Sequence, residues 1–311
     1  MGATTASCRI EGHNLAYRRV GHGEPLLLVH GITTWSFIWD GLIDELARHH
    51  DVVAVDLLGC GHSDKPLEVS YALKDHARRL ALLVDALELG PVHYAGHDLG
   101  GGIGQIMATR YRDHLRSLTM ANTVAFDFWP VQPIIALRTP VIRQLLMATF
   151  DLGTFRLVIQ RGLYHKDKAT PELLAKFNEP FGTESGRKAF LHFARCLDNH
   201  NLMEIAEPLG HLDLPVTVAW GKADVYLSFG IAERLAAAIP GCRLETTPTA
   251  GHFSPVDEPA WLAGVVLGTT RAAQAGDDRS PRARASHRAP RGRERHARRG
   301  ARGCVAPRSR G

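Results

Sequence analysis

The stretch VHYAGHDLGGGIG, Val92 to Gly104, combines a short apolar run, a glycine-rich corner and a run that is compatible with a helix. This order predicts a strand, a sharp turn and a helix, with Asp98 at the turn. Such a corner strains the backbone of its middle residue, so the neighbours must be small, and Gly96 and Gly100 meet that need. The helix N-terminus beside Asp98 stabilises an anion there. A glycine-rich loop with a helix-capping aspartate is the alternative interpretation.

Outward from this corner, apolar runs alternate with segments of helical spacing from residue 25 to residue 267. Leu26 to Val29 is a continuous apolar run, and Asp51 to Leu57 is nearly one. Both are typical of strands buried on both faces of a parallel sheet. Cys8 to Gly21 adds two short strands at the sheet edge. The pattern predicts an α/β fold with a mostly parallel central sheet that helices cover on both faces.

The alternation is interrupted once, after the sixth predicted strand, by a long helix-compatible segment whose first helix is predicted over Ile134 to Phe150. We therefore expect four regions: a first part of the core over residues 1–125, a helical cap over 126–212, a second part of the core over 213–270, and an Arg-rich tail over 271–311. A cap of this kind excludes water from a site below it and contacts the substrate.

The net charge of +5 over 311 residues belongs to the tail. From Arg271 onward there are 13 arginines, no lysine and 3 acids, a surplus of ten that leaves −5 for the rest of the chain. The composition of the tail predicts disorder. Nucleic acid is an unlikely partner, since it would be held only by the charge of this tail, without aromatic residues for base stacking.

The cysteines are odd in number and scattered, without a Cys-x-x-Cys pair: Cys8, Cys60, Cys196, Cys242 and Cys304. This usage favours free thiols in a reducing cytoplasm. No apolar run approaches the roughly 18 residues of a membrane helix, and the N-terminal residues lack a signal-peptide pattern, so no membrane association is expected. We expect a monomer or a homodimer.

Asp98, Asp224 and His252 each follow a predicted strand, in the order nucleophile, acid, histidine. The stretch around Asp98 resembles the nucleophile elbow of the α/β-hydrolase superfamily, with aspartate where most members carry serine. The resemblance covers about residues 9 to 268. It implies that Asp98 is the nucleophile, that His252 activates a water and that Asp224 orients the imidazole. Asp127, just past the sixth strand, is the alternative acid.

The aspartate points to a particular chemistry. A carboxylate that attacks a saturated carbon forms an alkyl ester, which water then cleaves at the carbonyl carbon of the enzyme. By the same resemblance, the backbone amides of Ile32 and Leu99 form the oxyanion hole, while His30 is a structural loop histidine. The closest branch contains epoxide hydrolases and haloalkane or haloacid dehalogenases.

The features that separate these subfamilies do not agree. Thr33 stands where epoxide hydrolases usually carry proline, and Leu99 stands where dehalogenases carry tryptophan or arginine. Tyr164 in the predicted cap suits an opening epoxide oxygen as a neutral donor, and this favours an epoxide hydrolase. His165 and Trp35 are further candidates for substrate contact, and His165, His192 or Tyr226 could replace the second cap tyrosine.

The expected substrate is a small apolar molecule, and neither a metal nor a cofactor is expected. A dehalogenase, or a non-hydrolytic member of the fold in a biosynthetic pathway, stays open as an alternative.

Overall fold

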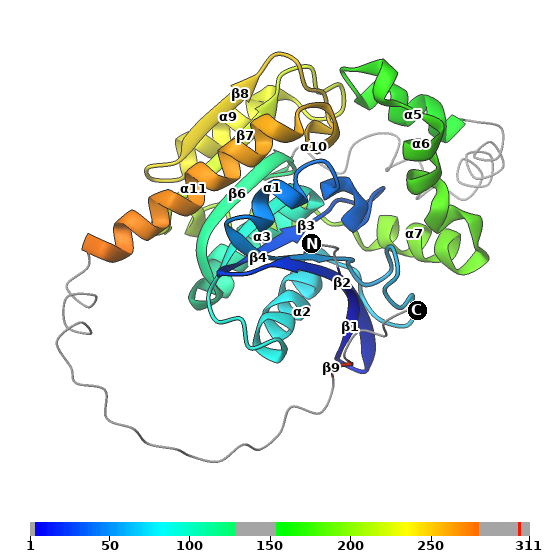
Figure 1. Cartoon of the computed structure of the whole chain (residues 1–311), viewed down its shortest axis with the longest axis horizontal. Coiled ribbons are helices and arrows are strands. Elements are labelled where there is room, and N and C mark those ends of the chain that lie inside the picture. The colour runs from blue at the N-terminus through cyan, green and yellow to red at the C-terminus, as the bar shows by residue number, and fades with distance from the viewer. Residues whose placement is uncertain (1–3, 128–153, 280–303, 306–311) are drawn as a thin grey trace.

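The computed structural model describes residues 4–127, 154–279 and 304–305. A central sheet runs through the molecule in the order β8-β7-β6-β5-β3-β4-β2-β1-β9 (Figure 1). Neighbouring strands from β3 to β8 are parallel, whereas β1, β2 and β9 pair antiparallel at one edge. The predicted α/β fold with a mostly parallel sheet is confirmed. The strands are β1 Thr4–Ile10, β2 His13–Gly21, β3 Glu24–Val29, β4 His50–Val55, β5 Val92–Asp98, β6 Leu115–Thr123, β7 Val216–Gly221, β8 Arg243–Thr247 and β9 Cys304–Val305.

Helices cover both faces of the sheet (Figure 1). On one face α2 (Leu73–Ala86) packs against α3 (Leu99–Arg110), and on the other α1 (Ile43–Ala47) packs against α11 (Pro259–Arg279). The short helix α10 (Ser254–Asp257) precedes α11, and α9 (Phe229–Ala238) joins β7 to β8. Short 3-10 turns connect several elements: η1 Ser36–Trp39, η2 Arg112–His114, η4 Lys166–Lys168, η5 Glu179–Gly182 and η6 Pro208–His211.

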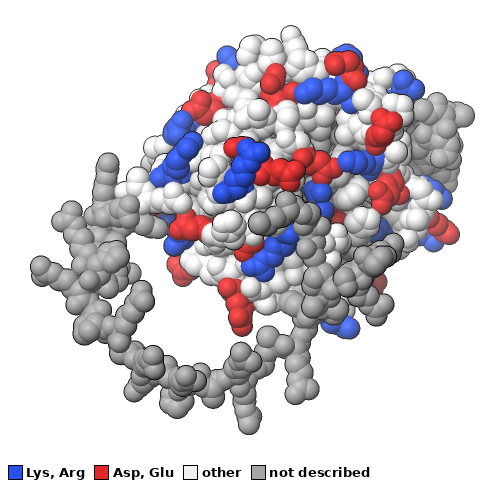
Figure 2. Space-filling view, viewed as in Figure 1, with Lys and Arg blue, Asp and Glu red and all other residues white. Residues whose placement is uncertain are grey.

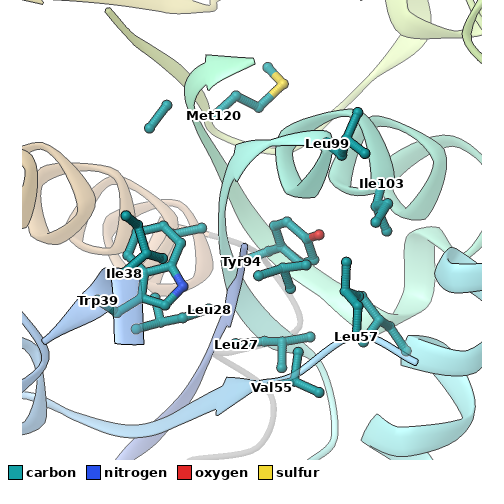
Figure 3. Close-up of a cluster of buried hydrophobic side chains, with 14 of the residues drawn as sticks. Leu27, Leu28, Ile38, Trp39, Val55, Leu57, Tyr94, Leu99, Ile103 and Met120 are labelled. Atoms are coloured by element: carbon teal, nitrogen blue, oxygen red, sulfur yellow. The ribbon is translucent and has the colours of Figure 1, made fainter. Parts of the chain in front are cut away.

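Burial on both faces explains the continuous apolar runs in the sequence. Leu27 and Leu28 are adjacent in β3 and therefore point to opposite faces, yet neither has any exposed surface. Figure 3 shows Leu28 beside Trp39 and Ile38 on one side of the sheet, and Leu27 beside Val55 on the other. Leu99 and Ile103, from the helix after Asp98, belong to the same core. The strands that carry the candidate site are thus held from both sides.

Helices are inserted between β6 and β7, where the cap is expected. We call α5 to α8 the inserted helices: α5 Thr154–Gly162, α6 Pro171–Asn178, α7 Glu184–Cys196 and α8 His200–Met203. Thr170 and Thr183 cap α6 and α7 by accepting hydrogen bonds from backbone amides of the first turn. The helix predicted over residues 134–150 lies outside the described residues.

Two expectations about the ends of the chain are wrong. Helix α11 continues to Arg279, so residues 271–279 are helical and do not belong to a disordered tail. Ala273 in this extension is buried, and Gln274 donates a 2.7 Å hydrogen bond to the carboxylate of Glu24. These contacts supply the tertiary stabilisation that local composition does not show. In addition, Cys8 is disulfide-bonded, which removes one argument for a reducing compartment.

The described surface has an ordinary mixture of charges. Lysine, arginine and acidic side chains are interspersed on the face that Figure 2 displays. Within the described part of the chain, no helix has both the length and the apolar character that crossing a membrane requires.

Candidate active site

Asp98 lies at a strained corner between β5 and α3. Its backbone has φ 53° and ψ −118°, a conformation that residues other than glycine rarely adopt. Two close approaches make the corner possible. A Cβ on Gly96 would overlap the backbone of Gly100, and a Cβ on Gly100 would overlap the carbonyl of Val29. The glycines around Asp98 are therefore required by packing, and the strain holds the carboxylate at the end of the sheet.

The backbone amides of Ile32 and Leu99 both act on the carboxylate of Asp98. The amide of Ile32 donates to Oδ2 of Asp98 at 3.2 Å, and the amide of Leu99, the next residue, helps to lower the pKa of the carboxylate. A Cβ on Gly31 would overlap the same oxygen. Burial raises the pKa of Asp98, while the charge of His252 and the two amides act in the opposite direction. Ile32 and Leu99 thus occupy the positions that the sequence assigns to an oxyanion hole.

His252 and Asp224 form a buried pair. Nδ1 of His252 lies 3.0 Å from Oδ2 of Asp224, and the aspartate side chain is only 1% exposed. Burial alone would lower the pKa of His252, but the charge and hydrogen bond of Asp224 and the charge of Asp98 together raise it. The pKa of Asp224 is lowered, because its pairing with His252 and two backbone amides outweigh its burial. The two residues meet as the sequence order suggests.

Asn122 also holds this pair, and the sequence analysis assigned it no role. Its Nδ2 donates to Oδ2 of Asp224 at 2.9 Å, while its Oδ1 accepts from the amide of Gly221 at 3.1 Å. The side chain therefore ties the end of β6 to the loop after β7. The positive φ of 39° at Asn122 is a signal of constraint that only the structure reveals.

The alternative acid, Asp127, lies elsewhere. Its carboxylate is 56% exposed and forms a 3.1 Å ion pair with Arg234 of α9. An exposed carboxylate with a cationic partner is not placed to orient a buried imidazole. The geometry therefore favours Asp224 as the acid.

A buried carboxylate organises the loop that carries His252. Asp257 accepts hydrogen bonds from three backbone amides, those of Gly251 at 2.8 Å, Tyr164 at 2.9 Å and His165 at 3.0 Å. The first lies in the histidine loop and the other two follow helix α5. Asp257 thus joins the loop to the segment after α5.

Two further histidines near Asp98 are held as neutral structural groups. Nε2 of His97 lies 2.8 Å from the carbonyl oxygen of His252, and burial lowers the pKa of His97 to about 3. His30 uses both ring nitrogens: Nδ1 donates to the carbonyl of Gly31 at 2.6 Å, and Nε2 accepts from the amide of Leu57 at 3.0 Å. Both rings fix backbone around the corner.

Among the contacts that the structure gives for the described residues, none joins the side chains of the predicted substrate contacts Trp35, Tyr164 and His165 to Asp98, Asp224 or His252. The indole N–H of Trp35 donates to the carbonyl of Lys176 in α6 at 2.9 Å, so it is already bonded. Tyr164 is 45% exposed and its ring packs edge-on against His165. Nε2 of His165 in turn lies 3.3 Å from Oε1 of Glu258. His192 bonds the carbonyl of Val69.

Tyr226, by contrast, lies directly on the His252–Asp224 pair. Its ring is perpendicular to that of His252 with centroids 5.4 Å apart, and its amide donates to Oδ1 of Asp224 at 2.8 Å. The hydroxyl donates to the carbonyl of Val158 in α5 at 2.6 Å. The sequence analysis named Tyr226 only as a possible replacement for the second cap tyrosine, and its position two residues after Asp224 is the sequence signal for this contact.

The model of the α/β hydrolase fold family matches residues 24–259, a span that includes every residue of the corner and of the acid–histidine pair. The chain belongs to the α/β hydrolase fold family. Two curated relatives cover most of it. The cis-3-alkyl-4-alkyloxetan-2-one decarboxylase of Shewanella oneidensis is 28% identical over 256 residues, 78% of this chain and 80% of the relative. Haloalkane dehalogenase 2 of Mycobacterium tuberculosis is 29% identical over 261 residues, 79% of this chain and 88% of the relative.

Solved structures of this family share the fold. The haloalkane dehalogenase DbeA from Bradyrhizobium elkani superposes with a TM-score of 0.78 at 22% identity, covering 88% of this chain and 100% of that one. The epoxide hydrolase CorEH gives a TM-score of 0.76 at 21% identity, covering 87% and 99%. The relatives support a hydrolase of this family. Their names do not agree on the bond that is broken.

Proposed function

We propose that this member of the α/β hydrolase fold family hydrolyses a small apolar epoxide through an alkyl ester on Asp98, which yields a diol. The observation that carries the proposal is the position of the Asp98 carboxylate at the strained corner, with Oδ2 bonded to the amide of Ile32. A carboxylate in this position is a nucleophile for a saturated carbon, not for an ester carbonyl.

The hydrogen bonds assign different tasks to the two carboxylate oxygens. Oδ2 is held by the amide of Ile32, so Oδ1 is the oxygen that attacks the substrate carbon. The new ester then has Oδ2 as its carbonyl oxygen, already in the oxyanion hole. His252 removes a proton from a water that attacks the carbonyl carbon, and Asp224 stabilises the imidazolium that results. The tetrahedral intermediate collapses by breaking the bond between Oδ1 and the carbonyl carbon, and the imidazolium of His252 gives its proton to the leaving oxygen, which releases the diol. The second water proton leaves the carboxyl group of Asp98 and replaces the proton that ring opening consumed.

The leaving oxygen of an epoxide needs a proton, and this step separates the candidate reactions. Tyr164 is exposed, so its hydroxyl is accessible to a ligand, whereas the hydroxyl of Tyr226 is bonded to Val158. We assign the donor role to Tyr164, which requires that its hydroxyl lies within hydrogen-bond distance of the epoxide oxygen once the substrate is bound. An organohalide needs no proton on its leaving group, so a dehalogenase uses the same Asp98 and His252 without this tyrosine.

A second candidate reaction is the opening of an oxetan-2-one, because the relative from Shewanella oneidensis bears that name. Asp98 would attack C4, the saturated ring carbon that is bonded to the ring oxygen, and the C4–O bond would break to leave a carboxylate, which needs no proton. The C–CO2 bond electrons would then form a C=C bond and expel Asp98. The products are CO2 and an alkene, and no water is consumed.

The intact mass of a His252→Ala variant tests these reactions together. The variant is incubated with styrene oxide, 1-bromohexane and a cis-3,4-dialkyl-oxetan-2-one, and His200→Ala, at an exposed position, is the control. An adduct equal to the whole epoxide, mapped to Asp98, supports the epoxide hydrolase. An adduct equal to the halide minus its hydrogen halide supports a dehalogenase. Alkene release by the variant, without an adduct, supports the decarboxylase.

A single turnover of the wild-type protein in ¹⁸O-labelled water separates hydrolysis from decarboxylation. Water that attacks the ester carbonyl leaves its oxygen in the carboxylate of Asp98, so the peptide containing Asp98 becomes heavier. Decarboxylation leaves this peptide unlabelled. An Asp98→Ala variant that still turns over any of these substrates would refute the nucleophile assignment.

A further inference from the structure

Helix α5 contacts the loops that carry His252 and Asp224 through two of its own backbone carbonyls. The carbonyl of Gly162 accepts the amide N–H of His252 at 2.8 Å, and the carbonyl of Val158 accepts the hydroxyl of Tyr226 at 2.6 Å. Val158 and Gly162 are four residues apart, so they lie on the same face of the helix, one turn apart. One face of an inserted helix is thus bonded to the catalytic histidine and to its aromatic neighbour.

The contact between α5 and these loops leaves no space for a side chain at position 162. A Cβ on Gly162 would overlap the rings of Phe253 and Tyr226, so α5 approaches as closely as glycine permits. Phe253 also packs on Phe177 of α6, with ring centroids 5.1 Å apart. The inserted helices and the histidine loop therefore form one packed unit.

Tyr226 is the side chain that connects this unit to the acid. Its amide donates to Asp224, its ring lies edge-on to His252, and its hydroxyl reaches α5. Burial raises the pKa of Tyr226 to about 12, so the hydroxyl stays a donor at neutral pH. Asp98 and Ile32 make no bond to this connection among those that the structure gives for the described residues.

We propose that Tyr226 is a positioning residue that locks helix α5 onto the His252–Asp224 pair and thereby sets the rate of ester hydrolysis. The effect on the rate of ester hydrolysis rests on the proposed function. The contact itself, the hydrogen bond from the Tyr226 hydroxyl to the Val158 carbonyl that we call the lock, does not. Ester formation needs Asp98 and its amides, but ester breakdown also needs His252 to hold a water at the carbonyl carbon. Small displacements of a catalytic group cost large factors in rate, about a hundredfold for 1 Å. Loss of the lock should therefore slow the second step selectively.

The test compares Tyr226→Phe with Tyr71→Phe. Each substitution removes one hydroxyl that donates to a backbone carbonyl at 2.6 Å, in the case of Tyr71 that of Pro66. Styrene oxide and 1-bromohexane are the probes, with the ester on Asp98 followed by rapid quenching and intact mass. For Tyr226→Phe we expect the ester to accumulate and kcat and KM to fall together, each roughly tenfold, with kcat/KM nearly unchanged. Tyr71→Phe should leave all three values unchanged.

Two kinetic results would overturn the proposal. If kcat/KM falls as much as kcat, Tyr226 acts in ester formation, as a proton donor to the leaving group would. If kcat, KM and kcat/KM all match those of the wild-type protein, the hydroxyl does not position His252.

Hydrogen exchange keeps the test independent of the substrate. We expect Tyr226→Phe, and not Tyr71→Phe, to speed exchange in peptides that cover residues 154–162 and 249–253, because the amide of His252 is bonded to α5. If the wild-type protein forms no ester with either probe, the proposed function is wrong for those substrates, and exchange alone then decides the lock. Unchanged exchange in both segments would overturn it.

Discussion

Nδ1 of His252 lies 3.0 Å from Oδ2 of Asp224, and the same oxygen accepts the side-chain amide of Asn122 at 2.9 Å. Oδ2 therefore receives one bond from His252 and one from a neutral, fixed side chain. This arrangement holds the carboxylate ionised and orients the imidazole with its Nε2 away from Asp224. Four predictions follow from this site and the corner beside it.

Asp224→Asn should reduce kcat roughly 10³- to 10⁴-fold, because the imidazole loses its orienting anion. The substitution should also shift the pH dependence of kcat to lower pH. The base must be neutral, so ester breakdown rises with pH through the raised pKa of His252. Without Asp224 this pKa falls, and the rising limb shifts to lower pH. The pH profile of kcat from pH 5 to 9 checks the direction, and a limb that moves upward would contradict it.

Asp127→Asn should change kcat by less than about twofold, since this carboxylate is exposed and paired with Arg234. An exposed ion pair contributes little to stability, roughly 0–1 kcal/mol, so the melting temperature should barely move. Parallel assays of the Asp127 and Asp224 variants decide which aspartate is the acid. A large loss of activity on substitution of Asp127 alone would reverse our assignment.

Gly31→Ala should slow ester formation at least roughly a hundredfold, because the added Cβ would push the Asp98 carboxylate off the amide of Ile32. Rapid-quench intact mass measures this step directly. Gly264→Ala is the matched control, since a Cβ there meets no atom within 4 Å. In helix α11 the control should be stabilising by up to about 1 kcal/mol, with normal activity.

Asn122→Ala should leave the hydrogen bond between His252 and Asp224 in place but hold Asp224 less firmly. Asp224 loses one donor and the amide of Gly221 loses its acceptor. A hydrogen bond to a charged group is worth about 1.5–3 kcal/mol, so kcat should fall roughly 10- to 100-fold. Circular dichroism should show an intact fold. Asn122→Gln, with the same groups on a longer side chain, should recover little, because the distances to Asp224 and Gly221 are set by the strands.

The sequence predicted the sheet and the corner because these depend on local patterns. Continuous apolar runs indicate strands buried on both faces, and the burial of Leu27 and Leu28 agrees with that reading. Closely spaced glycines around Asp98 indicate a corner in which a backbone needs space. Local patterns did not reveal that α11 extends to Arg279, since Gln274 is bonded to Glu24 of a distant strand.

The sequence by itself determined the α/β fold and the corner that carries Asp98, since periodicity and glycine spacing act over a few residues. Only the tertiary structure distinguishes Asp224 from Asp127, because both follow strands and only packing makes one buried and the other exposed. It alone placed Tyr226 against His252 and α5, and left Tyr164 half-exposed with its ring against His165. Such contacts join segments that are far apart in the chain, and their geometry depends on how the loops at the end of the sheet pack together.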